Sequence, residues 1–152
     1  MNGLMKLAGG LAVGAALHAS LLPMAAQAAD DKDVIDYRQH IMNTMSEQAS
    51  ALGQVLSTAV PPENLVAHLE VIALAARMSL KSFEPKVLGG ESKPEVWEKW
   101  ADFSERMNTF AASTAKVAQL AKEKGQDAIM ADLVDALSCK SCHDIYRDEK
   151  KK

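Results

Sequence analysis

The stretch Cys139-Lys140-Ser141-Cys142-His143, near the C-terminus of a 152-residue chain, contains both of its cysteines. Two thiols three residues apart on a helix lie on neighbouring turns of one face, so both can add to the two vinyl groups along one edge of a porphyrin. His143, the next residue, can give the porphyrin iron a nitrogen ligand. The spacing therefore predicts covalent attachment of one haem c through two thioethers.

Other chemistry uses the same cysteine spacing. A thioredoxin-type dithiol belongs at the start of a βαβ unit, and the sequence pattern predicts no strands. A structural zinc site needs further ligands at suitable spacing, and the sequence offers no second Cys or His pair for it. A disulfide across two intervening residues would close a very small loop and add little stability. Haem attachment is the interpretation that uses both thiols and the imidazole.

The first 28 residues have the pattern of a secretory signal peptide. They carry a single charged side chain, Lys6, then an apolar run, and they end in Ala26-Gln27-Ala28, a small-residue cleavage site. Gly and Pro residues interrupt the run, so we expect a cleaved signal and no stable membrane anchor. Because c-type haem is attached after export in bacteria, the expected location is the periplasm.

The mature chain, residues 29–152, is long enough for one domain with one core. Cleavage would remove one basic residue and no acidic one, which leaves 16 Lys and Arg against 20 Asp and Glu, a net charge of −4. This balance argues against nucleic acid as a partner and favours a cationic partner or one indifferent to charge.

Apolar residues recur at helical spacing in four segments that are separated by Pro and Gly signals. The expected helices are 31–56, 62–83, 92–124 and 126–148, with the longest loop at 84–93. The connections between successive helices are short, long and short. This pattern predicts an all-α fold, namely an antiparallel four-helix bundle with haem c in its core. The cysteine motif is then expected inside the last helix. The third helix has an aromatic stripe typical of a core face or a cofactor wall: Trp97, Trp100, Phe103, Met107, Phe110, Thr114 and Val117.

The chain resembles the class II cytochromes c, the family of cytochrome c-prime and its low-spin relatives. Residues 139–147 match the family pattern C-x-x-C-H-x-x-Y-R, and Tyr37-Arg38-Gln39 and Pro94-Glu95-Val96-Trp97 look like further family landmarks. The resemblance spans essentially the whole mature chain. It implies that Arg38 pairs with a haem propionate and that Arg147 lies near the proximal face, one turn after the histidine.

The resemblance also places Met42 where the family has its distal residue. If the Met42 thioether binds iron opposite His143, the haem is six-coordinate and the protein carries electrons between redox partner proteins, which is the function we expect. If Met42 only packs, the resemblance implies five-coordinate iron that binds nitric oxide or carbon monoxide. Met45, one turn on, is the next candidate ligand.

Two histidines are weaker candidates for the iron. His40 is two positions from Met42 and therefore points to nearly the opposite helix face, and His68 flanks the apolar stripe of the second helix. No catalytic acid, base or nucleophile accompanies the haem motif, so we expect a protein that is not an enzyme. The resemblance is compatible with a monomer or a homodimer.

Overall fold

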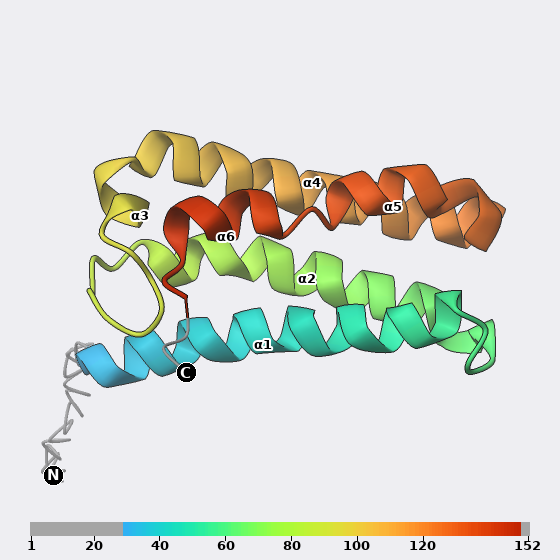
Figure 1. Ribbon diagram of the computed structural model, residues 1–152, viewed down its shortest axis with the longest axis horizontal. Helices are drawn as coiled ribbons and strands as arrows, with labels where there is room; N and C mark the ends of the chain where they lie inside the picture. The colour runs from blue at the N-terminus through green and yellow to red at the C-terminus, as the bar shows by residue number, and fades with distance from the viewer. Residues whose placement is uncertain (1–28, 150–152) are drawn as a thin grey trace, which may run out of the picture.

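The computed structural model describes residues 29–149 and shows an antiparallel four-helix bundle (Figure 1). The expected signal peptide, 1–28, and residues 150–152 lie outside the described residues. Three positions of the bundle are filled by α1 (Asp31–Leu56), α2 (Leu65–Phe83) and α4 (Trp100–Lys124). The fourth is shared by α5 (Met130–Ala136) and α6 (Lys140–Tyr146). The predicted fold is confirmed.

Three short elements complete the chain: η1 (Pro62–Asn64), α3 (Glu95–Glu98) and η2 (Gln126–Ile129). Within residues 29–149 all these elements are helical, and the extended pairing is limited to two isolated bridges, Gly89 with Ser92 and Ser92 with Arg147. No helix in this part of the chain is both long and apolar enough to cross a membrane.

Helix α1 has the bounds that the sequence predicts. Asp30 caps its N-terminus by accepting a hydrogen bond from the Lys32 amide at 2.9 Å, and Asp31 and Asp33 complement the positive end of the helix dipole. The helix ends at Leu56, before Pro61 and Pro62, whose rings cannot continue it.

The two later predicted helices are each broken, which corrects the prediction of continuous helices. The third is interrupted at Lys99, whose φ of −113° and ψ of 41° separate α3 from α4. The fourth breaks after Ala136, where the Ser138 hydroxyl donates to the Asp135 carbonyl at 2.9 Å and so competes with the helical backbone bonds. The cysteine motif therefore begins a new helix, α6, instead of lying inside a longer one.

The loop 84–94 packs against the first turns of α1 (Figure 1). Gly90 has a φ of +65°, and a Cβ atom there would lie 2.9 Å from the Ile35 side chain. Only glycine tolerates both the backbone conformation and the close approach. The Glu91 carbonyl accepts from the Asp148 amide at 2.8 Å, so the same loop also holds the end of α6.

Two packed regions lie along the bundle. The closed core joins α1, α2, α4, η2 and α5 through aliphatic side chains, namely Leu52, Val55, Leu65, Leu69, Ile72, Val117, Ala118, Ala121, Ile129, Leu133 and Ala136. The aromatic cluster joins the end of α2 to α3, α4 and α6, and consists of Phe83, Val96, Phe103, Met107 and Tyr146. The cysteine motif lies at the aromatic cluster.

Candidate haem site

Both cysteines lie at the start of α6. Cys139 is the residue before the first helical turn and is exposed, whereas Cys142 is half-buried and packs against the aromatic cluster. Both are free thiols. The two thiols are three residues apart at the start of one helix, the spacing expected for attachment along one edge of a flat ring.

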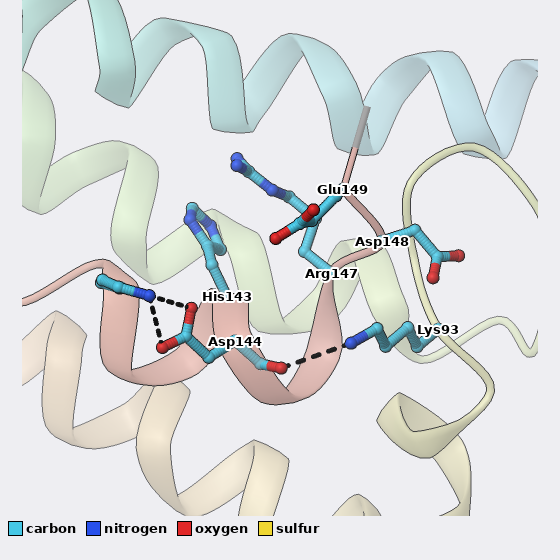
Figure 2. Close-up of a pocket in the computed structure, with 7 residues that line it drawn as sticks. Lys93, His143, Asp144, Arg147, Asp148 and Glu149 are labelled. Atoms are coloured by element: carbon cyan, nitrogen blue, oxygen red, sulfur yellow. Dashed lines mark hydrogen bonds and ion pairs between the residues drawn. The ribbon is translucent and has the colours of Figure 1, made fainter. Parts of the chain in front are cut away.

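A cavity of about 640 Å³ opens beside His143. Figure 2 shows the side chains of His143 and Arg147 projecting from one side of α6, the side on which α1 and α2 lie. The rim carries charges of both signs, and the lining residues are Lys93, Lys140, His143, Asp144, Arg147, Asp148 and Glu149. Lys140 is held by Asp144 at 2.6 and 2.7 Å, and Arg147 lies 3.9 Å from the Glu91 carboxylate.

The surroundings of His143 favour its neutral form. Burial lowers the pKa of the imidazole, and the nearby charge of Arg147 lowers it further. Metal ions bind neutral imidazole, so a lowered pKa suits His143 to be an iron ligand.

Tyr146, one turn after the cysteine motif, fastens α6 to α4. Its hydroxyl donates to Asp102, which also accepts from Arg106 at 2.7 Å, and its ring packs edge-on against Phe103 with centroids 5.1 Å apart. Burial and the hydrogen bond to Asp102 raise the pKa of Tyr146 to about 12. The neutral hydroxyl is therefore a permanent donor at physiological pH, and it fixes the helix that carries His143.

Arg38 brings a positive charge into the interior from α1, since the residue is only 3% exposed. Its Nη2 donates to the Val87 carbonyl at 2.7 Å and its Nε lies 3.4 Å from the Val34 carbonyl. Its Nη1 is buried and has no hydrogen-bond partner among the described residues. A buried cationic donor without an acceptor is costly, so this side chain fits a carboxylate such as a haem propionate.

Met42 is half-buried on α1, one turn beyond Arg38. It packs against the aromatic cluster and against a second apolar group, formed by Ile41, Met45, Ala75 and Ala76. Met42 is not among the residues that line the cavity beside His143. Met42 and Cys142 thus pack against the same aromatic cluster.

The other candidate ligands lie in less suitable positions. Met45 is buried, with its sulfur 4.0 Å from the Ser79 hydroxyl. His40 is exposed, and the His68 ring is hydrogen-bonded to Gln48 at 2.7 Å. Among residues 29–149 no group of three or more His, Cys, Asp or Glu side chains is arranged to hold a metal ion.

The structure brings together residues that the sequence analysis did not connect. The Arg38 guanidinium lies over the rings of both Phe83 and Trp97, with its Cζ atom 5.3 and 5.2 Å from their centroids. The Trp97 landmark was visible in the sequence, but no local pattern links it to Phe83 or Arg38. Asp102, the partner of Tyr146, also lacked any sequence signal.

The chain matches the family model of cytochrome c' over residues 33–147. It belongs to the cytochrome c' family. The resemblance seen in the sequence is thereby confirmed, and with it the expectation of a c-type haem as the cofactor.

Individual members of the cytochrome c' family and their relatives agree with this assignment. A cytochrome c' from Alcaligenes xylosoxydans xylosoxydans is 28% identical over 127 residues, which are 82% of this chain and 100% of that protein. Cytochrome c-554 from Cereibacter sphaeroides is 31% identical over 150 residues, 88% of this chain and 95% of that protein.

A solved structure extends the likeness to three dimensions. A ferrous variant of cytochrome c prime from Alcaligenes xylosoxidans with bound NO has a TM-score of 0.73 and 27% identity, and the match covers 80% of this chain and 98% of that one. A ferric mutant of the same protein, in complex with nitrite, has a TM-score of 0.72. The comparisons favour the gas-binding alternative over the electron carrier expected from the sequence.

Proposed function

We propose that this protein binds a small diatomic gas, nitric oxide or carbon monoxide, at a five-coordinate haem c in the bacterial periplasm. One finding carries the proposal: the chain matches the family model of cytochrome c' over residues 33–147 and shares its fold with solved cytochrome c prime structures. The NO-bound relative with the same fold supports it. Electron transfer with a redox partner protein would then be secondary, and no enzymatic reaction is part of the proposal.

The chain's own residues would hold the cofactor from several sides. Cys139 and Cys142 would form the two thioethers, and His143 would provide the proximal nitrogen in its neutral form. Arg38 would donate from Nη1 to a propionate oxygen. When bound, the haem would supply an iron that can bind a small diatomic gas. Arg147, on the same face of α6 as His143, would add positive charge near the proximal side.

Met42 and the apolar groups around it would control what reaches the side opposite His143. These groups consist mainly of apolar side chains, so a small uncharged molecule would meet a lower barrier there than an ion. In the electron-carrier alternative, the Met42 thioether would itself bind the iron and block access of a gas.

The test is a carbon monoxide titration of the ferrous, haem-loaded protein, followed in the Soret band. Wild type is expected to bind carbon monoxide without any prior change of spin state. Met42→Ala should bind it about tenfold more tightly, or about 1.4 kcal/mol, because a smaller side chain leaves more room. Met45→Ala is the matched control: it should lower stability and leave the affinity nearly unchanged, since Met45 lies deeper in the packing.

A different outcome of the titration would contradict the proposed function. Wild type that fails to bind carbon monoxide, together with a Met42→Ala variant that binds it readily, would show that Met42 is the sixth ligand. The protein would then be the electron carrier that the sequence analysis expected.

A further inference from the structure

The buried guanidinium of Arg38 contacts two aromatic rings from different elements. Phe83 ends α2, and Trp97 belongs to α3, on the far side of the loop 84–94. The two rings are tied to each other, because the Trp97 indole donates to the Phe83 carbonyl at 2.9 Å. We call Phe83 and Trp97 the aromatic clamp.

The clamp limits how the guanidinium can lie. The guanidinium contacts both ring faces, and its Nη2 already donates to the Val87 carbonyl. Cation–π contacts are stronger away from water, and two of them favour one orientation of a flexible side chain. The edge that remains is the one with Nη1, the buried donor without a partner in the described chain.

We propose that Trp97 is a positioning residue for the cofactor: it holds Arg38 so that Nη1 stays directed at a haem propionate. This inference rests on the proposed contact between Arg38 and the haem. Trp97 does not need to touch the haem itself for this role. Its effect would pass through the charge and orientation of Arg38.

The consequence would appear in the midpoint potential of the haem. A fixed positive charge beside the cofactor favours the reduced state, which carries one more electron, and low local polarity strengthens that effect. A guanidinium released from the clamp can turn toward water and be screened. Loss of Trp97 should therefore lower the potential, even though no charge has been removed.

The experiment compares four variants of the haem-loaded protein by redox titration and by urea unfolding. Arg38→Gln removes the charge, Trp97→Leu removes the clamp, and Trp97→Phe keeps a ring but loses the indole N–H. Trp100→Leu is the control: Trp100 is also half-buried and packs against the aromatic cluster, with its ring 5.8 Å from that of Phe103. Both Leu variants should lose stability to a similar degree.

We expect Arg38→Gln to lower the midpoint potential, and Trp97→Leu to lower it by most of the same amount. Trp97→Phe should restore nearly the wild-type value, and Trp100→Leu should leave it unchanged. A double variant of Arg38→Gln and Trp97→Leu should fall no further than Arg38→Gln alone, because both changes act through one charge.

Two results would overturn the inference, and they differ in what else they overturn. If Arg38→Gln lowers the potential and Trp97→Leu behaves like Trp100→Leu, then Trp97 is only part of the packing, and the Arg38 contact stands. If Arg38→Gln leaves the potential unchanged, the contact between Arg38 and the haem fails as well. In either case the carbon monoxide titration of the Met42 variant tests the proposed gas binding independently.

Discussion

At the α5 end of the bundle the helices meet in aliphatic side chains that exclude water, whereas at the α6 end they surround aromatic rings, a buried arginine and the cavity beside His143. The closed core contains no charged group and needs nothing from outside the chain to be complete. The α6 end contains a buried cation with an unused donor. This difference indicates that the closed core provides most of the stability of the bundle. The packing of the α6 end depends on a bound cofactor.

The largest effect is expected from removing both thiols. Cys139→Ala with Cys142→Ala abolishes covalent attachment, so the α6 end should lose its fixed packing and become molten while the closed core keeps its packing. Hydrogen exchange should show lost protection in α6 and α3 first, and longest protection around Ile72 and Val117 of the closed core. The control is Ser141→Ala, an exposed residue between the cysteines, which should behave as wild type. A double variant that unfolds as cooperatively as wild type would refute the difference between the ends.

The next effect is a loss of stability without a loss of function. Ile129 is fully buried in the closed core, so Ile129→Ala should lower the free energy of unfolding by about 2–5 kcal/mol. The optical spectrum and the carbon monoxide affinity should stay as in wild type. Val134→Ala, on α5 but 69% exposed, should change stability by less than about 0.5 kcal/mol. A changed spectrum in Ile129→Ala would mean that the two ends are coupled.

Sequence patterns captured the features that depend on neighbouring residues. The bounds of α1, the loop after Phe83 and the position of the cysteine motif all follow from capping, Pro and Gly signals, and spacing. These features are local, because each is set within a few residues of the chain.

The features that the sequence did not reveal depend on contacts between distant segments. Arg38 meets the Val87 carbonyl 49 residues away, and Tyr146 meets Asp102 44 residues away. The break at Lys99 was hidden because apolar spacing continues across it, although it separates the helix of Trp97 from the helix of Phe103. Side-chain placement of this kind requires the folded structure.

A smaller effect is expected where α6 is fastened to α4. Tyr146→Phe removes the hydrogen bond to Asp102 and should cost about 1 kcal/mol. In wild type the pKa of Tyr146 is raised from 10.0 to about 12 in the fold, so the stability from this group is present below pH 10 and is lost as the pH rises to about 12.

Unfolding measured between pH 9 and pH 12 checks this prediction. Wild type should lose stability over that window more steeply than Tyr146→Phe, which lacks the titrating hydroxyl. The same slope in both proteins would show that the hydroxyl contributes nothing to holding α6.

The central claim is that Met42 packs and leaves one axial position of the iron open. The most direct measurement is the optical and electron paramagnetic resonance spectrum of the ferric wild-type protein at neutral pH. We expect high-spin iron in the wild-type protein, without the near-infrared band of a sulfur ligand. Met42→Ala should have the same spin state. A low-spin wild type that becomes high-spin in Met42→Ala would contradict it and make Met42 the sixth ligand.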